Sequence, residues 1–151
     1  MIEDAIKRSR VLFNSGWYCA ESVLIAVAEH QGIRCTCVSR IATGLCSGLS
    51  RSGGMCGALM GAILGISLVL GRSDTSDPVD DCYLATQELR ENFETTFGSE
   101  SCHALTGCHL GTTEGRERFA DEGIHERCLE FVAEATRFAL EAVADSYSSS
   151  H

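Results

Sequence analysis

The stretch SGGMCGALMGAILGISLVLG, residues 52–71, decides the fold predicted for this chain. It carries no charged side chain and is long enough for a membrane span. A helix that is apolar on all sides is also typical of the centre of a helical bundle. Because this run is the only one of its kind and the flanking helices need a partner to pack on, we predict a buried core helix. Its spaced glycines, Gly57, Gly61 and Gly65, would let a neighbouring helix, a cofactor or a second copy of the chain approach closely.

Amphipathic segments on both sides of this run predict the rest of the bundle. We expect helices over residues 3–14, 19–31, 79–97 and 126–147, with shorter helical turns near 38–45, 102–105 and 116–123. Proline occurs once, and alanine, leucine, glutamate and arginine dominate between the glycines, which favours helices. The prediction is an all-α single domain over residues 1–147, with about five main helices around the glycine-rich one and a flexible tail over 148–151.

The charge balance restricts the class of partner. The net charge is −9, from 21 acidic and 12 basic residues, and no basic stretch is long enough to follow a phosphate backbone. Nucleic acid is therefore not an expected partner. The start MIEDAIKRSR lacks the apolar stretch of a secretory signal, so we expect a cytoplasmic protein. An acidic surface fits docking to a basic protein redox partner, although it is also typical of solubility alone.

Nine cysteines are many for a chain of 151 residues. In a reducing compartment, cysteines are usually free, metal-bound or catalytic. The helices predicted above begin close to Cys19, Cys56, Cys102 and Cys128. Helix N-termini present unpaired N–H groups and partial positive charge, which lower the pKa of a thiol and suit metal-bound sulfur. We therefore expect these four thiols to share one electropositive pocket, although a cysteine can also fill a core as a small apolar side chain.

The other cysteines receive separate predictions. Cys46 and Cys108 lie in glycine-rich and polar loops and are the candidates for additional metal ligands. Cys82 lies early in a long helix, where packing is the usual role. Cys35 and Cys37 are too close for a relaxed local disulfide, but two thiolates at that spacing could share a metal.

Missing motifs exclude several kinds of redox and nucleotide site. No Cys-x-x-Cys occurs, which excludes the thioredoxin dithiol, the zinc ribbon, the bacterial ferredoxin run and covalent haem attachment. No dinucleotide, phosphate-loop or nucleophile-elbow motif is complete. Histidines adjoin thiols at Cys102-His103, Cys108-His109 and His125-Glu126-Arg127-Cys128, so a mixed Cys/His zinc site is an alternative.

The motifs follow one another in a distinctive order. The central one is Cys56-Gly57-Ala58-Leu59-Met60-Gly61, preceded by Cys19-Ala20-Glu21 and followed by Cys102-His103-Ala104 and then Cys128. This order resembles the C-GCAxxG-C-C family of redox-active proteins from about Val11 to the last helix. Tyr18 departs from the family pattern, and no proline follows Cys128. The resemblance implies that Cys19, Cys56, Cys102 and Cys128 form the functional site.

The resemblance also implies a cofactor. A similar module accompanies an iron–sulfur centre in split-Soret cytochrome c, so this chain is expected to bind an iron–sulfur cluster of unspecified type and to transfer electrons. Two alternatives remain open. One is a metal-free thiol/disulfide redox protein with Cys56 as the low-pKa thiolate. The other is a module that binds zinc or another soft metal and catalyses nothing. Whether the chain is an enzyme is left open.

Overall fold

The computed structural model describes residues 1–150. In chain order its elements are α1 (Ile2–Asn14), α2 (Cys19–His30), α3 (Val38–Ala42), the short 3-10 helix η1 (Thr43–Leu45), α4 (Cys46–Arg51), α5 (Gly57–Leu70), α6 (Asp80–Phe97), α7 (Cys102–Thr106), α8 (Thr113–Asp121) and α9 (His125–Ser150). These residues contain no β-strand, and the predicted all-α class is confirmed.

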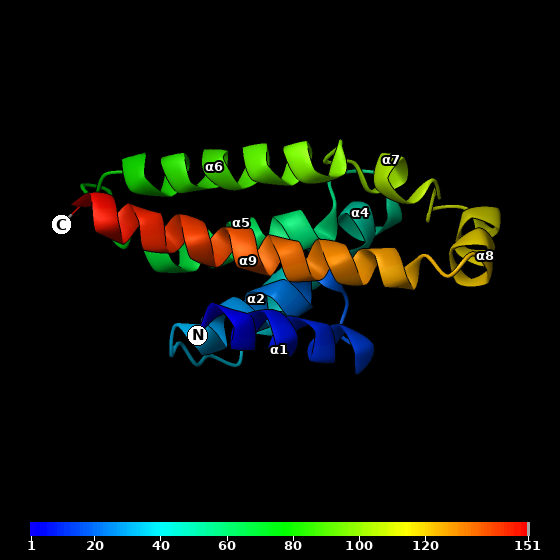
Figure 1. The fold of residues 1–151 in the computed structure, drawn as a ribbon, viewed down its shortest axis with the longest axis horizontal. Coiled ribbons are helices and arrows are strands. Elements are labelled where there is room, and N and C mark those ends of the chain that lie inside the picture. The colour runs from blue at the N-terminus through cyan, green and yellow to red at the C-terminus, as the bar shows by residue number, and fades with distance from the viewer. Residues whose placement is uncertain (151) are drawn as a thin grey trace.

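Helix α5 is the centre of the bundle, as predicted. It packs against α2, α6 and α9, and its Leu59 and Ile66 are fully buried. The long helix α9 runs along the molecule with α6 on one side and α1 and α2 on the other (Figure 1). The short elements α4, α7 and α8 gather at the end of the bundle where α9 begins (Figure 1). This end of the molecule holds most of the cysteines discussed below.

The glycines of α5 allow α2 to approach its backbone. A Cβ at residue 61 would lie 2.5 Å from the carbonyl oxygen of Ala20, and one at Gly65 would lie 2.9 Å from Val27 Cγ1. The predicted role of Gly61 and its neighbours in close helix packing is therefore confirmed within the chain. Because α2 covers this face, a homodimer would have to use a different surface.

The apolar helix begins next to Cys56, as predicted, and has 14 residues from Gly57 to Leu70. Residues 52–56 form an irregular segment before it, in which Met55 pairs with Ser101 in an isolated antiparallel bridge. Across residues 1–150, no helix has the combined length and hydropathy needed to cross a membrane.

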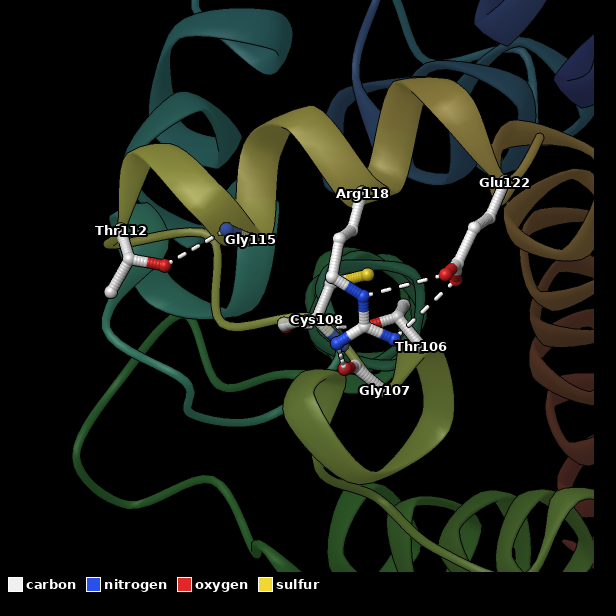
Figure 2. Close-up of polar contacts among 7 residues, drawn as sticks. All are labelled: Thr106, Gly107, Cys108, Thr112, Gly115, Arg118 and Glu122. Carbon is white, nitrogen blue, oxygen red and sulfur yellow. Dashed lines mark hydrogen bonds and ion pairs between the residues drawn. The ribbon is translucent and has the colours of Figure 1, made fainter.

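Two helices, α8 and α9, are longer than predicted. Helix α8 has nine residues where only a turn or two was expected. It is capped by Thr112, whose hydroxyl accepts the N–H of Gly115 at 2.9 Å (Figure 2). Helix α9 continues to Ser150, past the predicted end at residue 147. The last residue of the predicted tail, His151, lies outside the described residues.

Helix α4 is a left-handed turn, which the sequence did not predict. Ser47, Gly48, Leu49 and Ser50 have φ between 56° and 62°, and Arg51 has φ 70°. This conformation costs an L-residue roughly 1–2 kcal/mol. Local hydrogen bonds offset part of that cost: the N–H of Gly54 donates to the Gly48 carbonyl at 3.0 Å, and the Ser50 hydroxyl donates to the Gly44 carbonyl at 2.8 Å. Strained backbone of this kind is concentrated at functional sites.

Candidate functional site

One cavity is lined by all four cysteines that the sequence places at helix starts. It has a volume of about 470 Å³ and lies among the end of α1, the starts of α2, α5 and α9, and the short helices α4, α7 and α8. We call Cys19, Cys56, Cys102 and Cys128 the cavity cysteines. The prediction that these residues share one pocket thus agrees with the structure, whereas their role as ligands stays a prediction.

Each cavity cysteine lies at or near the first turn of a helix. Cys19 is the first residue of α2, and Cys56 immediately precedes α5. Cys102 is the first residue of α7 and follows Ser101, whose hydroxyl accepts the N–H of Ala104 at 3.3 Å. Cys128 lies in the first turn of α9.

Backbone hydrogen bonds hold two of these cysteines side by side. The N–H of Cys56 donates to the carbonyl of Glu100 at 2.7 Å, and the N–H of Cys102 donates to the carbonyl of Gly54 at 2.8 Å. The carboxylate of Glu100 also accepts two hydrogen bonds of 2.8 Å from Arg90 on α6. The bidentate pair fixes the segment before α7, which in turn orients Cys102 and Cys56 toward the same cavity.

Two glycines make room for cysteine sulfurs. A Cβ at Gly57 would collide with the Sγ of Cys19. A Cβ at Gly48 would lie 2.6 Å from the Cβ of Cys102 and 3.1 Å from its Sγ. Gly48 also has φ +62°, which only glycine adopts without strain. Gly57 of the central motif therefore leaves space for the Cys19 side chain, and Gly48 of the left-handed turn leaves space for the Cys102 side chain.

Burial raises the pKa values of three cavity cysteines above those expected from the helix starts alone. Burial raises the pKa of the Cys56 thiol to about 11, although the backbone N–H groups of Leu59 and Ala58 favour its thiolate. Burial, together with the neighbouring Cys56 thiol, raises the pKa of Cys128 to about 12. Burial also raises the pKa of Cys102. In the metal-free chain, burial therefore opposes the low pKa expected for the Cys56 thiol, because desolvation outweighs the N–H groups at the helix start.

Cys46, one of the two predicted additional ligands, lies behind the cavity wall and does not line it. It is buried, and its thiol donates to the Ala42 carbonyl at 3.5 Å. A hydrogen bond with the Cys19 thiol, together with burial, raises the pKa of Cys46. It is thus a direct neighbour of one cavity cysteine.

Cys108, the second predicted additional ligand, is also buried outside the cavity lining. Its N–H donates to the Thr106 hydroxyl at 3.1 Å. Figure 2 shows Arg118 of α8 next to it, with the guanidinium donating to the Gly107 carbonyl at 3.1 Å and paired with Glu122 at 3.4 Å. Proximity to Cys108 also raises the pKa of Cys102, so the two thiols are electrostatic neighbours.

The cavity has aromatic and cationic walls that the cysteine pattern did not reveal. Phe13, Trp17 and Phe131 supply apolar surface, and Arg51 and Arg116 supply positive charge. Arg51 lines the cavity because the left-handed turn brings it there. For the position of Arg51, the only signal in the sequence was the run of glycines and serines around the turn.

The histidines that adjoin cysteines in the sequence have different positions in the fold. His125 lines the cavity near Cys128, stacks on Phe13 with ring centroids 4.5 Å apart, and places Nε2 3.0 Å from Asn14 Oδ1. His103 and His109 are exposed and contact each other, with ring centroids 5.5 Å apart. Within the described part of the chain, no group of three or more His, Cys, Asp or Glu side chains is arranged to hold a metal ion. The mixed Cys/His zinc site stays a prediction.

The remaining cysteines lie elsewhere. Cys82 of α6 is half-buried and has its Sγ 3.8 Å from the hydroxyl of Ser67. Cys35 and Cys37 form a disulfide, whereas the sequence suggested the pair only as ligands of a shared metal. The turn before α3 brings their Cα atoms 5.3 Å apart, within the usual range for disulfides.

Comparison with known proteins gives a family match over most of the chain. The family described as "Putative redox-active protein (C_GCAxxG_C_C)" matches residues 17–142. An uncharacterized protein from Archaeoglobus fulgidus is 29% identical over 153 aligned positions, which cover 95% of each chain. No solved structure matches this chain. The matched segment contains all four cavity cysteines.

Proposed function

The chain belongs to the C_GCAxxG_C_C family of redox-active proteins, and from that premise we propose that it binds an iron–sulfur cluster through the four cavity cysteines and transfers electrons. The observation that carries this proposal is that these four thiols, from four separate helix starts, line a single cavity. Four cysteine thiolates are the usual ligand set of both [2Fe–2S] and [4Fe–4S] clusters.

The surroundings of the cavity suit a negatively charged cluster. The backbone N–H groups of Ala58 and Leu59 favour the thiolate form of Cys56, and N–H groups near a bound thiolate stabilise it and tune a cluster's potential. Arg51 and Arg116 line the same cavity and would offset part of the negative charge. The bound cluster would supply one-electron transfer, while Phe131 and the other aromatic walls would limit the access of water.

The arrangement of the thiols favours a cluster over a single metal ion. Zinc in a structural site needs all four ligands within roughly 2.0–2.3 Å of one point. A cluster instead distributes its thiolates over two or more irons, around a body of several atoms. Thiols distributed around a cavity of about 470 Å³ correspond better to the second arrangement.

Electron transfer requires a second component, and we propose a protein redox partner. A chain of net charge −9 would be steered toward a basic docking surface. We also propose a cytoplasmic location, because a reducing compartment keeps the cavity thiols available for a cluster.

Serine substitution tests the ligand assignment. Cys19, Cys56, Cys102 and Cys128 would be replaced one at a time, with Cys82→Ser as the matched control outside the cavity. The protein would be purified without oxygen, and iron per chain and the visible absorption spectrum would be measured. We expect each cavity substitution to remove most of the iron and the control to keep it. Full iron content in all four variants would refute the assignment.

The same iron measurement shows whether the buried cysteines next to the cavity also bind iron. Cys46→Ser and Cys108→Ser are expected to retain the iron of the unsubstituted protein, because neither side chain lines the cavity. Loss of iron in either variant would move that cysteine into the ligand set. Zinc in a colourless protein, lost on His125→Ala, would favour the mixed zinc site instead.

A further inference from the structure

The Cys35–Cys37 disulfide is a redox-active group that the proposed cluster site does not use. Both cysteines, and Thr36 between them, are exposed in the turn that connects α2 to α3. Neither residue lines the cavity that holds the cavity cysteines. A disulfide that solvent-borne thiols can reach is chemically different from a buried structural one, because exchange depends on access to sulfur.

We propose that Cys35 and Cys37 form a second redox centre, a surface disulfide that is reduced by the dithiol of a partner and oxidised again by a disulfide. This activity goes beyond the proposed cluster function, because it needs neither iron nor the cavity cysteines.

The charge around the disulfide favours thiolate chemistry. Arg34 precedes Cys35 directly and Arg40 follows Cys37 by one helical turn, whereas residues 31–41 contain no acidic side chain. This local positive charge stands out in a chain of net charge −9. Nearby arginines stabilise thiolates, which are both the attacking and the leaving groups of thiol–disulfide exchange.

One hydrogen bond indicates which sulfur is attacked. The backbone N–H of Cys37 donates to the Sγ of Cys35 at 3.3 Å. It would stabilise negative charge on Cys35, so Cys35 is the better leaving group. A partner thiolate therefore attacks the Sγ of Cys37, the Cys35–Cys37 bond breaks, and Cys35 leaves as a thiolate. The partner's second thiol then attacks its own sulfur in the mixed disulfide and releases Cys37. The partner loses two electrons and two protons, and the chain gains two thiols.

The surface next to the disulfide is hollowed. A groove of about 730 Å³ is lined by Cys35 together with apolar side chains such as Ile33 and Val38, and by the charged Arg34 and Glu29, of which Glu29 is paired with Arg8. Trp17 lines this groove and also the cavity of the cavity cysteines. The groove gives a thiol-bearing molecule room beside the sulfurs, and the indole lies between the two redox sites.

Differential alkylation tests the proposal on the whole protein. The oxidised chain is equilibrated with dithiothreitol, or in a second arm with reduced and oxidised glutathione, then alkylated and digested with trypsin. Cleavage after Arg34 and Arg40 releases residues 35–40, which contain both cysteines and no others. Cleavage after Arg72 and Arg90 releases residues 73–90, in which Cys82 is the only cysteine and serves as the control.

We expect the 35–40 peptide to change from no alkyl groups to two in a single transition as the dithiol is increased. The 73–90 peptide should carry its label throughout. A transition with dithiothreitol and not with glutathione identifies a dithiol partner, and a transition with both extends the partner class to small monothiols. A 35–40 peptide that is always fully labelled, or never labelled in the native protein, overturns the proposal.

Three variants test the order of attack and the independence of the two sites. The thiol left in Cys37→Ser should react with iodoacetamide several-fold faster than the thiol left in Cys35→Ser, because the N–H of residue 37 still reaches the Sγ of Cys35. Equal rates would contradict the order of attack. The double variant should lose exchange and keep the iron of the parent protein; loss of iron would mean that the two sites are not separate.

Discussion

Gly57 and Cys19 meet where α5 crosses the start of α2, and the sulfur of Cys19 fills the space that a Cβ on residue 57 would need. Gly57→Ala is therefore expected to displace the Cys19 sulfur from the cavity wall. Overpacking of this kind typically costs about 1–3 kcal/mol of stability. We expect a lower free energy of unfolding, measured in urea, together with loss of most of the bound iron.

Two other glycines separate the effect on the site from the effect on packing. Gly65→Ala would meet the side chain of Val27 at 2.9 Å on the same helix pair, about two turns of α5 away from Gly57. It should lower stability and leave more iron bound than Gly57→Ala does. Gly44→Ala meets nothing within 4 Å and should change neither property. Equal iron content in the variants at 57 and 65 would contradict a specific role for Gly57.

Gly48 and Gly107 both have positive φ, but only at Gly48 would an added Cβ meet a cysteine side chain. Alanine at either position is expected to cost roughly 1–2 kcal/mol from backbone strain. Gly48→Ala should cost more, because its Cβ would lie 2.6 Å from the Cβ of Cys102. The larger loss of stability and a loss of iron specific to Gly48→Ala would be measured by urea unfolding and iron analysis. Equal losses of stability and of iron in Gly48→Ala and Gly107→Ala would contradict a role for the close approach of residue 48 to Cys102.

The bidentate pair between Arg90 and Glu100 predicts a pH-dependent contribution to stability. The hydrogen bonds from Arg90 hold the pKa of Glu100 below its ordinary value. A lowered pKa stabilises the fold above the unfolded value of about 4.3, and this stabilisation is lost as the pH falls through the lower folded pKa. Because Arg90 is half exposed, Glu100→Gln should cost less than about 1 kcal/mol at pH 7. Urea unfolding curves should begin to converge with those of the parent protein as the pH falls below about 4.3, and a difference that is constant with pH would contradict the ion pair.

Glu88 on α6 is expected to change the stability with pH in the opposite direction. Partial burial, followed by the nearby carboxyl of Asp145 on α9, raises the pKa of Glu88 above its ordinary value. A raised carboxyl pKa destabilises the fold at pH values above the folded pKa, and this cost disappears in acid, below the unfolded value. Glu88→Gln should therefore increase the free energy of unfolding at pH 7 to 8. Glu117→Gln on the exposed face of α8 is the control, and an equal gain there would point to net charge alone.

The arrangement of the helices was predictable because hydrophobic pattern and helix-end signals act locally. The uncharged run with Gly57 and Gly61 predicted a buried centre approached closely by a neighbour, and α2 occupies that position. Capping residues such as Ser101 marked the helix starts at which the cysteines lie. The extent of α8 was missed because its sequence is strongly polar and its Thr112 cap was not recognised.

The details of the site depend on contacts that a sequence pattern does not contain. The left-handed turn at Ser47–Arg51 runs against the backbone preference of four of its five residues, so it is maintained by hydrogen bonds to other parts of the loop. The raised pKa of Cys56 follows from burial by helices distant in sequence. The disulfide at Cys35 depends on the turn conformation between α2 and α3.

Iron, zinc and acid-labile sulfide content, measured with the absorption spectrum on untagged protein purified without oxygen, decides whether the cavity cysteines hold a cluster. We expect iron and sulfide in nearly equal amounts and visible absorbance typical of a cluster, both abolished by Cys56→Ser. Absence of iron and sulfide after attempts to load a cluster, with the fold intact, would contradict an iron–sulfur site at the cavity cysteines.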